Sequence, residues 1–206
     1  MKLYSYVVRY DTGAAPNPFW GYCTLTICKP AIGRVAKVGD WIVGTGSKVN
    51  VGTDRLIYTM KVDEVLTLLD YGKDPRFQKK IPSTAGKRRK GDNIYYVNTY
   101  GVIVQRPHSM HSPKDMVHDL SGRNALISYP NNFYYFGREA PLIEEYSCLI
   151  KRGPGHKCNF PKESIASFLS WIQKQVPGIN GLPYHFSEGS RQGNDQRKDS
   201  CSKCNS

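Results

Sequence analysis

Short β-prone segments separated by glycine and proline are the feature that most restricts how this chain can fold. The 206 residues include 19 Gly and 13 Pro, which interrupt regular elements. Between these breaks, β-branched and aromatic residues predict strands at residues 3–10, 22–28, 41–44, 56–65, 92–104, 124–129 and 133–136. The apolar run that starts at residue 56 is also compatible with a helix.

One helix is well defined by its pattern. Apolar side chains in residues 161–176 recur at helical spacing, with Ile165, Phe168 and Ile172 on one face. Pro161 suits a first helical turn, and Pro177 with Gly178 ends the segment. Strands therefore dominate without regular alternation with helices, which disfavours a doubly wound parallel sheet. We expect an α+β protein built on a small, partly open β-barrel with a few flanking helices.

The composition predicts one folded domain at residues 1–186 and a flexible polar tail at residues 187–206. Aromatic residues make up 12% of the chain, which argues against general disorder. No apolar run reaches 18 residues, so no membrane span is expected. The first residues lack the apolar core and cleavage site of a secretory signal, which predicts a cytoplasmic protein.

Excess positive charge is the first indication of a partner. The net charge is +12, and only four basic and three acidic residues follow position 186, so the predicted domain itself is strongly basic. Residues 79–90, here called the basic segment, contain six cations and no acid: Lys79, Lys80, Lys87, Arg88, Arg89 and Lys90. This pattern predicts a basic surface loop that either contacts phosphates or is simply solvated.

Metal and redox chemistry are weakly supported. Cys201 and Cys204 form one CxxC pair, which is half of a zinc-ribbon pattern. Cys23 and Cys28 are five steps apart on one predicted strand, so they should lie on opposite faces. The histidines at positions 108, 111 and 118 do not match a metal motif and are interpreted as polar loop residues. We therefore expect no metal and no cofactor.

Familiar catalytic and phosphate-binding motifs are missing. The sequence has no GxSxG, no Walker A loop and no GxGxxG. The run Gly44-Thr45-Gly46-Ser47 is either a turn after a strand or a backbone wall that a ligand approaches closely.

Two aromatic–amide clusters carry most of the functional interest. They occupy residues 17–20 (NPFW) and 131–136 (NNFYYF). Aromatic rings stack on bases, and asparagine can read base edges as both donor and acceptor. The alternative is that the rings belong to the core and the asparagines form turns.

Several longer runs point to a known family. They are residues 6–30, 38–47, 60–65, 74–77, 91–95 and 132–137. These runs resemble the nucleotide modification associated domain 2 family over about residues 3–180. The resemblance implies a bacterial or phage protein linked to modified DNA bases, and it implies no established catalytic residue. Gly39, Asp40, Ser47 and Asp74 are also similar to the pattern of EVE and other PUA-like barrels, whereas residues 13–20 and 78–92 depart from it.

The first functional hypothesis is a binding module for a modified base or nucleotide, with DNA favoured over RNA as the nucleic-acid partner. The expected base-binding residues are Asn17, Phe19, Trp20, Thr45, Ser47, Asn132 and Tyr134. The expected phosphate contacts are Arg9, Arg34, Arg138, Lys87, Arg88 and Arg89.

The second hypothesis is an enzyme that hydrolyses a modified nucleotide or transfers a group on it. Such an enzyme needs a general base and a group that stabilises developing charge. Residues of the right types are Asp40, Lys61, Asp63, Glu64 and His156, but no spacing singles any of them out.

Overall fold

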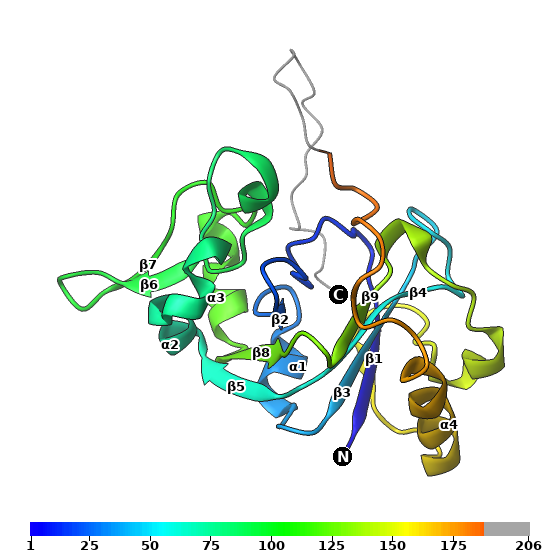
Figure 1. Cartoon of the computed structure of the whole chain (residues 1–206). Coiled ribbons are helices and arrows are strands. Elements are labelled where there is room, and N and C mark those ends of the chain that lie inside the picture. Colours follow the sequence, from blue (N-terminus) through cyan, green and yellow to red (C-terminus); the bar gives the residue numbers. More distant parts are fainter. Residues whose placement is uncertain (188–206) are drawn as a thin grey trace.

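The computed structural model describes residues 1–187, which form two open sheets, a hairpin and four α-helices (Figure 1). The large sheet has the order β10 (His156–Lys157), β1 (Leu3–Val7), β3 (Trp41–Thr45), β4 (Leu56–Lys61), β9 (Phe133–Tyr135) and β11 (Gly178–Ile179). The small sheet has the order β2 (Cys23–Leu25), β8 (Asn124–Ser128) and β5 (Glu64–Thr67). The hairpin pairs β6 (Tyr95–Val97) with β7 (Ile103–Gln105).

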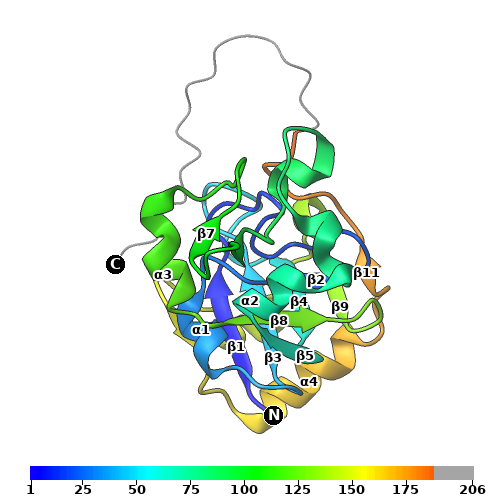
Figure 2. The same cartoon turned by 90° about the vertical axis from the view of Figure 1, so that its left-hand side faces the viewer.

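The chain passes between the two sheets just after β4. The predicted strand at residues 56–65 is in fact two strands, because β4 ends at Lys61 and β5 begins at Glu64 in the other sheet. The strand alternative was therefore correct and the helical one was wrong. Figure 2 shows the small sheet, with β8 and β5, lying in front of β1, β3 and β4.

The space between the sheets holds the main core. Side chains from β1, β2, β3, β4, β8 and β9 meet there, together with Ile32 from α1 (Pro30–Val35). The hydroxyl groups of two buried tyrosines, Tyr6 and Tyr58, form a hydrogen bond of 2.9 Å in this core. Burial with a hydrogen-bond partner lets a tyrosine fill volume without an unsatisfied polar group. The core therefore fixes β1 against β4 even though β3 lies between them in the sheet.

The opposite face of the large sheet is covered by α4 (Lys162–Ile172) and the 3₁₀ segment Glu144–Leu149. Ile165, Phe168 and Ile172 are buried there, as the helical periodicity predicts. The helix is shorter than the predicted 161–176, and Val176 lies beyond it and is exposed. The remaining helices, α2 (Leu68–Lys73) and α3 (Met116–Leu120), lie on the side of the small sheet and the hairpin (Figure 1).

The α+β class is confirmed, whereas the PUA-like barrel is not, because no closed barrel forms within residues 1–187. The large sheet ends at two short edge strands, β10 and β11, and β2 pairs with β8 in the second sheet. None of the helices in the described part of the chain has the length and apolar content needed to cross a membrane. Nearly all of the predicted tail, including Cys201 and Cys204, lies outside the described residues.

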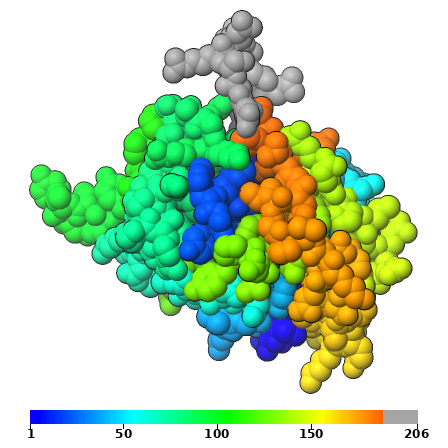
Figure 3. Space-filling view, viewed as in Figure 1, coloured from blue at the N-terminus to red at the C-terminus, as the bar shows by residue number. Residues whose placement is uncertain are grey.

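The basic segment was predicted to be a loop of surface cations, and its structure differs from that prediction. It is mostly two 3₁₀ turns, Pro75–Lys80 and Gly86–Lys90, and Lys80 is fully buried. In the space-filling view, the 13–20 loop (blue) reaches the surface between the green residues that include the basic segment and the orange residues before position 188 (Figure 3). Phe19 contacts both neighbours, since its ring lies 5.7 Å from that of Phe186 and 5.4 Å from Lys87 Nζ.

Candidate functional site

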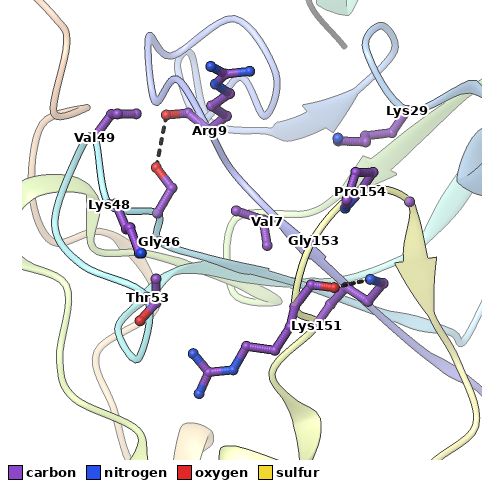
Figure 4. Close-up of a pocket in the computed structure, with 13 residues that line it drawn as sticks. Val7, Arg9, Lys29, Gly46, Lys48, Val49, Thr53, Lys151, Gly153 and Pro154 are labelled. Atoms are coloured by element: carbon purple, nitrogen blue, oxygen red, sulfur yellow. Dashed lines mark hydrogen bonds between the residues drawn. The ribbon is translucent and has the colours of Figure 1, made fainter. Parts of the chain in front are cut away.

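A cavity of about 390 Å³ opens beside one end of the large sheet (Figure 4). We call it the cationic pocket, because five of its thirteen lining residues are basic and none is acidic. The basic residues are Arg9, Lys29, Lys48, Lys151 and Arg152. The others are Val7, Gly46, Ser47, Val49, Thr53, Gly153, Pro154 and Gly155.

Strand direction explains why these residues meet. β1 and β3 run parallel, with Val7 opposite Thr45, so their carboxyl ends lie at the same edge. Arg9 follows β1 there, and Ser47 and Lys48 follow β3. β10 runs antiparallel to β1, with His156 opposite Tyr6, so the loop 151–155 that precedes β10 reaches this edge as well. Three segments far apart in sequence thus build one rim.

The rim loop at residues 46–52 is held by side-chain hydrogen bonds. Ser47 Oγ donates to the carbonyl oxygen of Arg9 at 3.1 Å, and Asn50 Nδ2 donates to that of Val8 at 2.8 Å. Gly46 is required for its close backbone approach, since a Cβ there would lie 2.1 Å from the carbonyl oxygen of Gly52. The pocket wall is therefore preorganised on the β1 side.

Most of the pocket's positive charge is not neutralised by acids among residues 1–187. Arg152 pairs with Asp54 at 2.7 Å. Within residues 1–187, the other four pocket cations form no ion pair with an acid. Lys29 Nζ lies 4.8 Å from the centre of the Tyr6 ring. Burial and, secondarily, the charge of Lys29 lower the pKa of nearby His156. This site favours an anionic ligand.

A second cluster, here called the Cys–His–Asp cluster, consists of Cys28, His111 and Asp119. Cys28 Sγ and His111 Nε2 are hydrogen-bonded at 3.0 Å. His111 Nδ1 lies 2.5 Å from Asp119 Oδ2. The imidazole therefore stands between a thiol and a carboxylate, in the order that activates a nucleophile.

The supporting contacts of this cluster are specific. Tyr95 OH donates to Asp119 Oδ2 at 2.8 Å, and the backbone N–H of Cys28 donates to Asp119 Oδ1 at 3.4 Å. His111 and Asp119 are buried, whereas Cys28 is only half-buried. His111 lies in a loop, as predicted, but its side chain is buried and contacts Asp119 and Cys28, whereas His118 lies on α3 and not in a loop.

The backbone at Cys28 is unusual. Its φ is +66°, a left-handed conformation that is strained for a residue other than glycine. Cys28 follows the β2 segment and precedes α1, so it occupies a strand-to-helix turn. Nucleophiles of hydrolases are commonly presented on strained turns of this kind.

Metal binding is not supported by the geometry. His111 lies between Cys28 and Asp119 and contacts them through opposite nitrogens, so the three donors cannot face one ion. Within residues 1–187 no group of three or more His, Cys, Asp or Glu residues could hold a metal.

The first aromatic–amide cluster is largely occupied with structural contacts. Asn17 is buried: its Oδ1 accepts from Lys80 Nζ at 2.7 Å, and its Nδ2 donates to the carbonyl oxygen of Lys90 at 2.9 Å. Phe19 is buried, whereas Trp20 is half-buried and 5.8 Å from Lys80 Nζ. Base binding by these residues stays a prediction.

Lys80 lies at the centre of a buried polar network. It donates to two backbone carbonyls, those of Asn17 and Tyr22, and to Thr24 Oγ1 at 3.0 Å. Thr24 Oγ1 in turn donates to Asp92 at 2.6 Å, and Tyr71 OH donates to Asp92 at 2.8 Å. Burial lowers the pKa of Lys80 to about 8, against the opposing attraction of Asp92. Burial also raises the pKa of Asp92.

The other predicted base contacts are dispersed. Thr45 is buried and donates to the carbonyl oxygen of Tyr6, while Ser47 lines the cationic pocket. Tyr134 is buried in the core beneath α4. Asn132 lines a separate cavity of about 510 Å³, formed with Tyr22, Arg76, Tyr129, Pro130 and Asn131. Neither cavity combines the two predicted clusters.

Of the predicted phosphate contacts, Arg9 lies in the cationic pocket. Arg34 donates to Ser121, and Arg138 donates to the carbonyl oxygens of Pro183 and Phe186. The three predicted contacts in the basic segment, Lys87, Arg88 and Arg89, are all exposed. Arg88 Nε donates to the carbonyl oxygen of Ile81. Phosphate binding by these five residues stays a prediction.

The acids proposed for the enzyme hypothesis serve local structure. Asp40 accepts from the backbone N–H groups of Lys2 and Lys37. Asp63 accepts from the backbone N–H of Tyr129 and from Asn132 Nδ2. Glu64 forms a two-bond ion pair with Arg76, which lowers the pKa of that carboxyl.

The family model for nucleotide modification associated domain 2 matches residues 1–190. The chain belongs to this family. No curated protein and no solved structure matches it. Membership in the nucleotide modification associated domain 2 family indicates involvement in nucleotide modification.

Sequence reasoning missed four of the five pocket cations and the whole Cys–His–Asp cluster. Lys48 follows a predicted strand, and Lys151 and Arg152 precede Gly153-Pro-Gly155, which is a weak signal for a ligand-binding loop. Nothing in the spacing relates Cys28 to His111, which is 83 positions away. Only tertiary structure brings those two together.

Proposed function

We propose that this protein binds the phosphate of a nucleotide, free or within DNA, in the cationic pocket as part of nucleotide modification. The observation that carries the proposal is a cavity of about 390 Å³ with five basic and no acidic lining residues. That volume falls within the range of about 300–1,000 Å³ for small-ligand sites. Family membership supplies the nucleotide context.

The pocket offers both recognition elements that a nucleotide needs. Arg9, Lys48 and the loop cations can hold phosphate oxygens through charge-assisted hydrogen bonds. Val7, Val49 and Pro154 supply apolar surface within the same cavity (Figure 4). The exposed cations of the basic segment extend the positive surface for a longer nucleic acid.

Charge reversal in the pocket tests this proposal. Lys48→Glu should weaken binding of a nucleoside triphosphate or a fluorescent single-stranded DNA by about tenfold or more at low salt, because one charged hydrogen bond is replaced by repulsion. Fluorescence anisotropy and calorimetry measure the two ligands separately. Lys174→Glu, on the exposed surface after α4, is the matched control. Equal affinities for the two variants, or no binding by wild type, would contradict the proposal.

Recognition of a modified base by the aromatic–amide residues forms the finer part of the proposal. Trp20 is the half-buried ring of the 17–20 cluster, and its ring can stack on a base. Trp20→Ala should therefore weaken binding of single-stranded DNA by about 1–3 kcal/mol. Tyr100→Ala, an exposed ring in the β6–β7 turn, is the control. Unchanged affinity in Trp20→Ala would remove this residue from the site.

A further inference from the structure

We propose that Cys28, His111 and Asp119 form a nucleophilic centre that cleaves an ester, thioester or amide bond through an acyl–Cys28 intermediate. Cys28 is the nucleophile, His111 the general base and acid, and Asp119 the positioning residue. The centre itself is independent of nucleotide binding. The expected substrate, an acyl compound that carries a phosphate group, rests on the proposed function of the cationic pocket.

The arrangement has each contact that the chemistry needs. Nε2 of His111 is 3.0 Å from the thiol sulfur, close enough to take its proton. Nδ1 of His111 is 2.5 Å from Asp119, which selects the ring orientation and stabilises the imidazolium. Asp119 is held in turn by Tyr95 OH at 2.8 Å. Tyr95 therefore positions Asp119, Asp119 positions the His111 ring, and the ring contacts the thiol.

The thiol residue lies between the core and the surface. Cys28 is half-buried and packs against the cluster of Ile27, Ile94 and Tyr95, whereas His111 and Asp119 are buried. Its left-handed φ of +66° is a strained conformation of the kind that concentrates at functional sites. Cys23 shows the contrasting case, because it is fully buried in the core and burial raises the pKa of its thiol.

The reaction balances with water as the only co-reactant. His111 takes the thiol proton while the sulfur attacks the carbonyl carbon, and the carbonyl electron pair moves onto oxygen. When that pair returns, the bond to the leaving oxygen, sulfur or nitrogen breaks, and His111 gives its proton to the leaving group. Water then attacks the thioester, His111 takes one of its protons, and the departing sulfur recovers that proton as the acid is released.

The substrate class follows from the next residue in the chain. Lys29 lines the cationic pocket and directly follows Cys28, and consecutive Cα atoms are about 3.8 Å apart. The backbone of Cys28 is therefore adjacent to a residue of the phosphate-binding cavity, although Cys28 itself does not line it. A substrate with a phosphate on one side and a carbonyl on the other matches this juxtaposition.

Selective alkylation tests the nucleophile without any assumed substrate. Iodoacetamide at pH 6 should label Cys28 at least about tenfold faster than the exposed Cys148 and Cys158, measured by peptide mass spectrometry, because His111 lies 3.0 Å from the Cys28 sulfur and can take its proton. This comparison lies within one wild-type molecule and needs no variant to fold. Labelling of Cys28 no faster than Cys148 would overturn the proposal.

An acyl donor tests the reaction. With p-nitrophenyl acetate, wild type should release nitrophenol in a burst and carry an acetyl group on Cys28, while Cys28→Ala should lose both. Cys148→Ser is the control and should keep them. Asp119→Asn should slow Cys28 labelling by about tenfold or more, because the imidazole loses its orientation. A burst that persists in Cys28→Ala, or acetylation only at other sites, would overturn the proposal.

These outcomes are separable from those of the proposed function. Loss of nucleotide binding with fast Cys28 labelling would contradict the phosphate site alone. Binding that survives in Cys28→Ala together with slow labelling in wild type would contradict the nucleophile alone.

Discussion

Lys80→Ala is expected to lower the free energy of unfolding by about 3–5 kcal/mol, the cost of removing one partner from a buried charged network. The ammonium group of Lys80 satisfies the carbonyl oxygens of Asn17 and Tyr22, and its loss leaves the buried Asp92 without a nearby cation. Urea denaturation measures the change. Lys79→Ala is the matched control, because Lys79 is the neighbouring residue and is exposed. Equal midpoints for the two variants would contradict this role of Lys80.

Lys80 should also make the free energy of unfolding depend on pH, in a direction that its pKa predicts. Burial lowers the pKa of Lys80 to about 8, below the value of about 10.4 for an unfolded lysine. Between these values the unfolded chain binds more protons, so stability should rise with pH. Relative to Lys80→Met, wild type should gain up to about 1.4 kcal/mol per pH unit between pH 8 and pH 10. A constant difference across that window would contradict the lowered pKa.

Phe168→Ala is the second large effect, with an expected loss of about 3–5 kcal/mol of unfolding free energy. Phe168 is fully buried beneath α4, and its ring packs edge-on against Tyr146 at 5.5 Å. The substitution leaves a cavity between α4 and the large sheet. Since domains are stable by only about 5–15 kcal/mol, much of the total would be lost.

Chemical denaturation with tryptophan fluorescence suits this test, because Trp171 lies 5.8 Å from the Phe168 ring. Ser167→Ala, on the exposed side of α4, is the control and should change stability by less than about 0.5 kcal/mol. A loss below about 1 kcal/mol for Phe168→Ala would show that α4 contributes little to the core.

Local patterns predicted most strands and the longest helix because those elements depend on neighbouring residues. The alternation in residues 22–28 gave β2, and the 3.6-residue spacing of Ile165 and Phe168 gave α4. The division into two sheets could not be predicted, since the pairing of β2 with β8 joins residues about 100 positions apart. The two separate sheets leave the expected barrel unconfirmed.

Prediction of the candidate site was limited by burial. A run of cations indicates a solvated surface, and only the fold shows that the Lys80 ammonium is enclosed by backbone oxygens. Likewise, a histidine in a loop without periodicity gives no sign that it will stand between a thiol and a carboxylate. The family resemblance supplied the nucleotide context but named no residue, so the pocket and the Cys–His–Asp cluster came from the tertiary structure.

The side chain of Asn17 holds both ends of the basic segment. Asn17 accepts from Lys80 through its oxygen and donates to the Lys90 carbonyl through its nitrogen, so both ends of the basic segment are fastened to the same residue. The cations between these two points therefore lie on a segment that is held at both ends. Inserting or deleting residues between Lys80 and Lys90 would change how far the cations project from the surface. The two hydrogen bonds to Asn17 and the core beneath them would stay in place.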